Sequence, residues 1–249
     1  YFYKNVSGSP LVRPAWYFDV KQQGEGIVDV TTHLVDLVQW SCFPEQIIRK
    51  TDIGMISAKR WSTVFTPEEF KSVTQLDKFP NYLNSYVKDG KLNVFANGQM
   101  IYKIKGSVAK ITVEWRYKAP EGTGDSFHSI LRGTNGSLEI CQGEAEKYLP
   151  TLYVNADDKT DLRTFEATLE DAIQNSTHKG LSLKKVSEKR WEVIIPDKYK
   201  VGHEAHFAQV TEKFLGYLKD GKLPRWEVPN MIAKYYTTTS ALKMALKSK

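Results

Sequence analysis

The sequence predicts an α+β fold, in which helices are layered on one face of a large, mostly antiparallel open sheet. Two observations lead to this expectation. Short segments with alternating polarity, separated by turn residues, fill the centre of the chain and are typical of antiparallel strands. Apolar residues recur at helical spacing on both sides of that central region. We expect residues 1–249, the whole chain of 249 residues, to form one domain.

The first predicted helix runs from Gly26 to about Trp40, because its apolar residues recur every three or four positions. Pro44 lies just beyond the expected end of this helix. A second helix is predicted to begin after Thr66, which has a side chain suited to an N-cap and is followed by Pro67 in the first turn.

The centre of the chain is predicted to form strands. They are expected at residues 57–65, 92–95, 99–105, 109–117, 127–132, 137–141 and 152–155. The sequence Ala96-Asn97-Gly98 predicts a hairpin turn between the second and third of these strands, and Asn135-Gly136 predicts another turn. Towards the C-terminus, helical spacing and alternation return. Helices are expected at 159–177, 203–219 and about 228–247, and strands at 181–186 and 190–195.

Composition and charge exclude several classes of protein. Apolar residues make up 41% and charged residues 26% of the chain, and no apolar run approaches the roughly 20 residues that cross a bilayer. The net charge of +6 is spread over lysines that alternate with acidic residues, so we expect no nucleic-acid or membrane partner. We expect a soluble protein of the cytoplasm or periplasm. Cys42 and Cys141 lack metal-ligand spacing, and His203 and His206 are three residues apart instead of four, so no metal site is expected.

Asp29, His33 and Asp36 follow one another at steps of four and three residues, which place side chains on one side of a helix. A carboxylate one turn from an imidazole can orient it and raise its basicity. His33 would then accept the hydroxyl proton of an alcohol while hydride leaves the same carbon. Asp29 would orient this imidazole, and Asp36 would support the pair. The alternative is a buried histidine bonded to its neighbouring carboxylates without any substrate.

The stretch from Gly24 to Trp40, GEGIVDVTTHLVDLVQW, resembles the GGG-x-x-x-D-x-G-x-H-x-x-D segment of the Gfo/Idh/MocA oxidoreductases. The residues from Arg13 to Asp19 resemble the approach to that segment, and those from His206 to Pro224 resemble a late helix of the family. Residues 226–239 resemble the closing helix of a bacterial subgroup with a "putative oxidoreductase C-terminal domain". The resemblance is thin across the central strands.

The resemblance implies that a Rossmann domain for NAD or NADP precedes this chain, which then forms the substrate-binding and oligomerisation domain. Asp29 and His33 match the catalytic pair of the family. We expect Asp36, Trp16 and His206 to contact the substrate. The partners implied are a carbohydrate or polyol, the chain's own N-terminal domain and further copies of the chain, which bind through the exposed sheet face.

Two residues depart from the family pattern, since Glu25 and Thr31 stand where glycines are expected. Thr31 is expected to narrow the space for nicotinamide or substrate, so a degenerate site remains an alternative. The segment from Gly24 to Asp29 also lacks the third glycine of a dinucleotide cradle. We therefore expect no tightly bound nicotinamide cofactor and no activity in this isolated chain.

The sequence as a whole predicts the catalytic C-terminal domain of an NAD(P)-dependent oxidoreductase that acts on a sugar, polyol or cyclitol. The first alternative is a non-catalytic carbohydrate-binding or assembly module with the same fold. The second is a metal-dependent hydrolase, which elemental analysis would identify.

Overall fold

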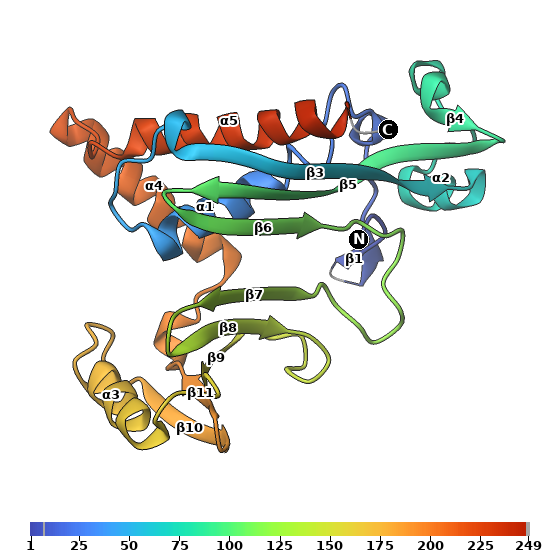
Figure 1. The fold of residues 1–249 in the computed structure, drawn as a ribbon. Helices are drawn as coiled ribbons and strands as arrows, with labels where there is room; N and C mark the ends of the chain where they lie inside the picture. Colours follow the sequence, from blue (N-terminus) through green and yellow to red (C-terminus); the bar gives the residue numbers. More distant parts are fainter. Residues whose placement is uncertain (7, 248–249) are drawn as a thin grey trace. The chain divides into compact units, whose positions relative to one another are not determined.

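The computed structural model describes residues 1–6 and 8–247 (Figure 1). The chain divides into two compact units, which we describe separately. Unit 1 comprises Tyr1–Ala119 and Gly221–Lys249, and unit 2 comprises Pro120–Asp220. The named strands pair antiparallel in both units, and helices accompany each sheet, which confirms the α+β class. The strands form separate sheets of four, five and two strands where one large sheet was expected.

The sheet of unit 1 is built around one long strand, β5 (Lys91–Ile104). β3 (Ile53–Phe65) pairs along most of β5, while β4 (Val87–Lys88) and β6 (Ser107–Val113) pair with its two ends. The helix α5 (Glu227–Ala245) packs along β3, and α1 (Thr31–Cys42) contacts both α5 and β6 (Figure 1). Smaller elements complete the unit: β1 (Asn5–Val6), β2 (Ser9–Pro10), η1 (Ala15–Phe18), η2 (Lys50–Asp52) and η3 (Asn81–Tyr86).

Two apolar clusters form the core of unit 1. One lies between the sheet and the helices α1 and α5 and includes Ile27, Met100 and Ala241, all fully buried. The other is mainly aromatic and includes Phe2 and Phe65, whose ring centroids are 4.8 Å apart in an edge-to-face arrangement. Burial of such large apolar side chains is the main favourable contribution to the stability of the unit.

The hairpin predicted at residues 96–98 is wrong, because β5 continues through it without a turn. Asn97 instead uses its side chain at the sheet edge: its amide nitrogen donates to Thr63 Oγ1 at 2.9 Å, and its oxygen accepts from the Trp115 amide at 2.6 Å. Gly98 is needed for close packing, because a Cβ atom there would lie 2.5 Å from Ile27 Cβ. The Asn97-Gly98 pair therefore serves tertiary contacts and does not form a turn.

Unit 2 contains a five-stranded antiparallel sheet of order β10-β11-β9-β8-β7. Its strands are β7 (Phe127–Arg132), β8 (Gly136–Gln142), β9 (Thr151–Ala156), β10 (Ser182–Ser187) and β11 (Arg190–Ile194). The helix α3 (Leu162–Gln174) packs on this sheet through Phe165, whose ring lies 5.7 Å from that of Trp191. The short helix η4 (Asp197–Tyr199) precedes α4 (His203–Asp220). These elements confirm the expected strands and helices of this region with small shifts at their ends.

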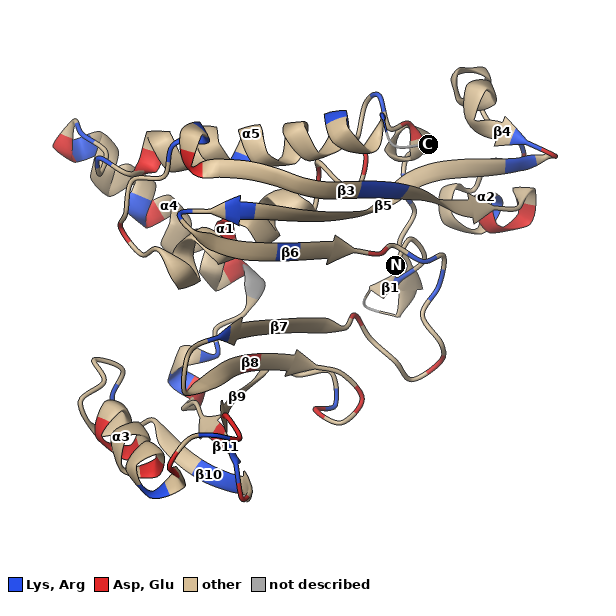
Figure 2. Cartoon of the chain, viewed as in Figure 1, with Lys and Arg blue, Asp and Glu red and all other residues tan. Residues whose placement is uncertain are grey.

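Charged residues of opposite sign lie close together in unit 2. Figure 2 shows basic residues on β10 and acidic residues on α3, and these two elements are in contact. The Lys185 ammonium lies 2.9 Å from the Glu166 carboxylate, and the Lys184 ammonium lies 3.4 Å from that of Glu192. The absence of a nucleic-acid partner stays a prediction. In residues 1–6 and 8–247, no helix combines the length and the apolar character that would span a bilayer.

The helix α2 (Pro67–Thr74) begins after Thr66 as its N-cap, as predicted from the sequence, and Glu69 completes a capping box. Thr66 Oγ1 accepts from the Glu69 amide at 3.2 Å, and Glu69 Oε2 accepts from the Thr66 amide at 2.9 Å. We expect Thr66→Ala to lower the free energy of unfolding by about 1 kcal/mol, since it leaves helix N–H groups without an acceptor. Denaturant unfolding measures this loss. Thr66→Ser keeps the oxygen and should retain most of the stability, whereas equal losses in both variants would contradict a capping role.

Candidate functional site

A small pocket opens to solvent in unit 1, beside the start of α1. Its empty volume is about 290 Å³ with the mouth included. The lining residues are Phe2, Tyr17, Gln23, Gly24, Gly26, Asp29, Val94, Ala96 and Trp115. Aromatic rings thus form much of the wall, while Asp29 and Gln23 supply the polar side chains.

The glycines of residues 24–26 allow the chain to pass very close to β5. Gly24 has φ +92°, a left-handed conformation that glycine adopts without strain. The Gly26 amide donates to the Phe95 carbonyl at 3.0 Å, and a Cβ atom on Gly26 would lie only 1.8 Å from the Ala96 carbonyl oxygen. This glycine-rich segment therefore packs against a strand, and the Gly26 amide is already used there.

Glu25, between the two glycines of this segment, takes part in a mostly buried ion pair. Its Oε1 lies 2.5 Å from Arg60 Nη1 on β3, and the two side chains are 12% and 22% exposed. The Arg60 guanidinium also lies 4.0 Å from the centre of the Phe95 ring. The second oxygen of Glu25 is buried and has no hydrogen-bond partner among the residues that the structure describes. Glu25 thus joins the glycine-rich segment to the sheet.

Asp29 lines the pocket but precedes the helix that the sequence predicted to carry it. Helix α1 begins at Thr31, and residues 26–30 form hydrogen-bonded turns instead. Asp29 Oδ2 accepts from Gln23 Nε2 at 3.0 Å, which holds the carboxylate at the pocket. Burial raises the pKa of the neighbouring Tyr17, and Asp29 adds to this rise while Arg13 opposes it. Tyr17 is therefore protonated at neutral pH and can donate a hydrogen bond.

His33 lies in the first turn of α1 and is exposed to solvent. Within the described part of the chain, no hydrogen bond to its imidazole is found, so the expected bond to Asp29 is not formed here. Neither residue is enclosed in the apolar core: Asp29 is partly exposed and borders an open pocket. The catalytic roles of Asp29 and His33 stay predictions.

The other residues expected to contact substrate are placed differently. Asp36 Oδ2 lies 2.7 Å from Lys234 Nζ, an ion pair that joins α1 to α5. Trp16 is 46% exposed and its ring lies 6.3 Å from that of Tyr17, which itself lines the pocket. His206 is exposed on α4, in unit 2. The structure thus places only Trp16 next to a pocket residue.

Thr31 does not narrow the pocket as the sequence led us to expect. Its side chain is fully buried, and its hydroxyl donates to the Ile27 carbonyl at 2.6 Å, one helical turn earlier. It is not among the pocket-lining residues. The Thr31 side chain therefore packs within the helix region and leaves the pocket unchanged.

Sequence reasoning missed Gln23 and Trp115 as pocket residues. Gln23 directly precedes the glycine-rich segment, so its position was the only signal available. Trp115 follows β6, far from Asp29 in the sequence, and its amide is fixed by Asn97 on β5. The pairing of β5 with β6 and the bonds of the Trp115 backbone to Asn97 and Thr63 bring this indole to the pocket.

The family model described as "Putative oxidoreductase C terminal domain" matches residues 1–246. The chain is also similar to a crystal structure of a putative oxidoreductase from Parabacteroides merdae, with 53% identity and a TM-score of 0.97. This similarity covers 100% of the chain described here and 57% of the other, so the chain spans little more than half the length of that protein. No curated protein is significantly similar to the chain.

Proposed function

The chain belongs to the family of putative oxidoreductase C-terminal domains, and from this premise we propose that it is the substrate-binding and catalytic part of an NAD(P)-dependent oxidoreductase. We further propose that the substrate is a sugar, polyol or cyclitol, and that the enzyme is of the Gfo/Idh/MocA type. The observation that carries the proposal is the open pocket with Asp29 at its wall and His33 in the adjoining helical turn.

The pocket has the chemistry that recognises a polyhydroxylated ring. Apolar faces of sugars pack on aromatic rings, while their hydroxyl groups need hydrogen-bond partners at fixed positions. The Arg13 guanidinium lies 4.6 Å from the centre of the Tyr17 ring and 5.6 Å from that of Trp115, so it holds the two rings together. Asp29, fixed by Gln23, can accept a hydrogen bond from one hydroxyl group, and Tyr17 can donate to another.

The proposed role of His33 is to accept the proton of the hydroxyl group that is oxidised. Its imidazole is exposed and has no hydrogen-bond partner in the described residues, so it is available to a substrate. Asp29 would bind the same or a neighbouring hydroxyl group and hold it towards the imidazole. NAD(P), when bound, would supply the hydride acceptor for the oxidised carbon.

The glycine-rich segment does not fit the pyrophosphate of a dinucleotide. Amides free to bind phosphate are the essential feature of such a cradle, but the Gly26 amide donates to Phe95 and the Gly24 amide donates to Val20. Glu25 also places a carboxylate between the two glycines, and a carboxylate repels phosphate. We therefore propose that a Rossmann domain outside residues 1–249 binds NAD or NADP, in line with the larger size of the Parabacteroides merdae protein.

Exposed apolar residues on α4 support contact with another domain or with a second copy of the chain. Phe207, Val210, Phe214 and Leu218 recur at helical spacing, and each is more than half exposed. Such a face on a helix is typical of a surface that is covered in the assembled protein. The exposed sheet face remains our proposed site of homo-oligomer contact.

The test of the proposed function is His33→Ala in the full-length protein. We expect turnover of the oxidised polyol or sugar to fall at least about 100-fold, because the proton acceptor is lost. Stability should stay unchanged, since the side chain is exposed and removal leaves no cavity. His178→Ala, at another exposed histidine, is the matched control and should leave turnover unchanged. Undiminished turnover in His33→Ala would remove this residue from the mechanism.

A non-catalytic carbohydrate-binding module is the second candidate, and the lack of a hydrogen bond between His33 and Asp29 in the described structure favours it. In that case the full-length protein does not reduce NAD(P)⁺ when any sugar is supplied as substrate, but it still binds a sugar at the pocket. Trp115→Ala should then abolish sugar binding, whereas His33→Ala should leave it intact. Calorimetry on these variants measures sugar binding, and the presence or absence of NAD(P)⁺ reduction by the full-length protein separates the two candidates.

A further inference from the structure

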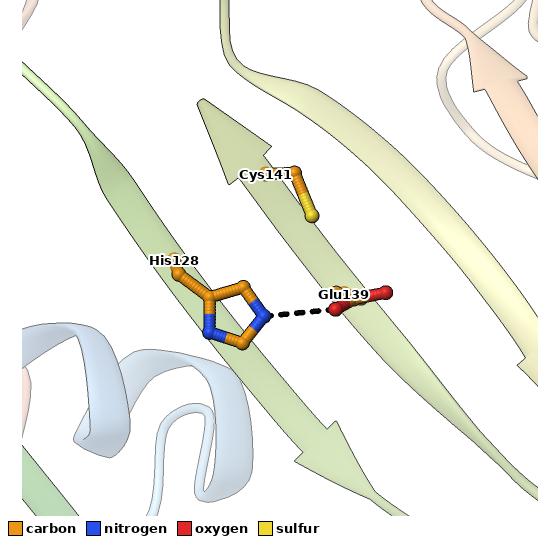
Figure 3. Close-up of side chains that lie close together, drawn as sticks. All are labelled: His128, Glu139 and Cys141. Atoms are coloured by element: carbon orange, nitrogen blue, oxygen red, sulfur yellow. Dashed lines mark hydrogen bonds and ion pairs between the residues drawn. The ribbon is translucent and has the colours of Figure 1, made fainter. Parts of the chain in front are cut away.

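A histidine, a carboxylate and a thiol lie together on the sheet of unit 2. His128 on β7 is the register partner of Cys141 on β8, and Glu139 precedes Cys141 by two residues. Since side chains two residues apart in a strand share a face, all three lie on the same face of the sheet. Figure 3 shows the imidazole directed at Glu139, with the sulfur of Cys141 on the same side of β8.

The spacing of the three groups suits one small ion. His128 Nε2 lies 2.8 Å from Glu139 Oε1, and one potential ligand atom from each residue lies within 4.8 Å of the others. Bonds to zinc of about 2.0–2.3 Å in tetrahedral geometry place neighbouring ligand atoms about 3.3–3.7 Å apart. The cluster therefore needs only small side-chain rotations to reach this geometry, and His128, with a side chain that is 59% exposed, can make them.

We propose that His128, Glu139 and Cys141 bind a divalent transition-metal ion of the zinc class. Imidazole nitrogen, thiolate sulfur and carboxylate oxygen are the three ligand types that zinc takes in proteins. Three protein ligands leave a fourth position for water or another small ligand. The three residues belong to unit 2 and the residues that line the Asp29 pocket belong to unit 1, so the proposed site goes beyond the proposed oxidoreductase function.

The partners of Glu139 support this assignment because they leave one of its oxygens available. Its Oε2 accepts from Arg190 Nη1 at 2.6 Å and from Asn155 Nδ2 at 3.3 Å, whereas Oε1 faces His128. These hydrogen bonds hold the carboxylate in place and direct Oε1 towards the imidazole. Outer contacts of this kind orient metal ligands in known sites.

The positive charge of Arg190 is compatible with a bound cation. Its Nη2 lies 3.8 Å from Cys141 Sγ, where it can donate to a thiolate, and its guanidinium is held 3.8 Å from the centre of the Tyr153 ring. The Glu139 carboxylate and the Cys141 thiolate would together offset the charge of a divalent ion, so that the site with Arg190 would carry one net positive charge. Binding would release the thiol proton to solvent and free Nε2 of the imidazole, with its proton moved to Nδ1 or lost to solvent.

The test is a titration of the metal-free chain with Co²⁺, followed by displacement with Zn²⁺. We expect one equivalent of Co²⁺ to produce the charge-transfer absorption of a cobalt–thiolate bond and visible bands of a four-coordinate ion. Zn²⁺ should abolish both. Cys141→Ser should remove the charge-transfer band. His128→Ala should weaken zinc binding at least about 100-fold in calorimetry, more than the loss of an outer contact costs.

Cys42→Ser is the matched control, because Cys42 is the only other cysteine in the sequence and lies on α1 in unit 1. It should leave the cobalt spectrum unchanged. Circular dichroism of each variant confirms folding, and the exposed position of His128 makes His128→Ala the safer of the two ligand variants. Absence of a thiolate band in the native chain, or its persistence in Cys141→Ser, would show that the three residues form only a hydrogen-bonded ion network.

Discussion

Gly26→Ala is expected to lower the free energy of unfolding by at least about 3 kcal/mol, one of the largest effects of any single substitution in the chain. The new Cβ atom would lie 1.8 Å from the Ala96 carbonyl oxygen and 2.3 Å from its carbon. Both are backbone atoms of β5, a strand with partners along both edges, so neither can move aside without loss of sheet hydrogen bonds. The segment would have to lift away, which would also break the bond from the Gly26 amide to Phe95.

Denaturant unfolding followed by circular dichroism measures this loss. Gly216→Ala is the control, because a Cβ atom at Gly216 on α4 would meet nothing within 4 Å. In a helix interior the same change should add about 0.5–1 kcal/mol. If Gly26→Ala unfolded at the same denaturant concentration as the unmodified chain, the close passage of residues 24–26 over β5 would be disproved.

Arg60→Met is expected to lower the free energy of unfolding by about 3 kcal/mol, the lower part of the range for a broken buried ion pair. Glu25 is only 12% exposed, and its second oxygen already lacks a hydrogen-bond partner in the described structure. Without Arg60 the carboxylate would remain buried with no compensating charge. The methionine side chain fills most of the space against Phe95, so the loss reports mainly on charge.

A double variant separates the ion pair from packing. Glu25→Gln combined with Arg60→Met removes both charges and should recover a large part of the stability lost in Arg60→Met alone. Unfolding of the two single variants and the double variant gives the coupling energy between the side chains. Additive losses, with no coupling, would mean that the 2.5 Å contact contributes nothing to stability.

The sequence predicted correctly the features of the fold that depend on interactions between residues close in the chain. The N-cap at Thr66 is one case, since the hydrogen bond from the Glu69 amide to its hydroxyl joins residues within the same turn. The strands of unit 2 are another, because alternating polarity and turn residues mark their ends. The predicted start of α1 at Gly26 is five residues too early. Residues 26–30 have helical spacing, but they form turns that are bonded to β5 through the Gly26 amide.

Features that depend on tertiary contacts were not predictable in the same way. Asn97 and Gly98 look like a turn because Asn-Gly is the preferred hairpin pair, yet their roles depend on Trp115 and Ile27, which lie far away in sequence. The division into separate sheets follows from a segment containing Pro120, Gly122 and Gly124 between β6 and β7, residues that do not extend a strand ladder. Asp29 was found from its spacing, but its partner Gln23 was not.

Unit 1 is built from two segments of the chain that are separated by unit 2, and this affects how it folds during biosynthesis. When the ribosome has synthesised residue 220, every strand of both large sheets has been made, but α5, which covers β3, has not. A nascent chain of that length would expose Met100, Tyr102 and Ile104, which are buried in the mature protein in the cluster that α5 completes. Unit 2, a continuous segment, can fold first, whereas unit 1 must wait until α5 has also been synthesised, and its apolar core residues are exposed to aggregation until then.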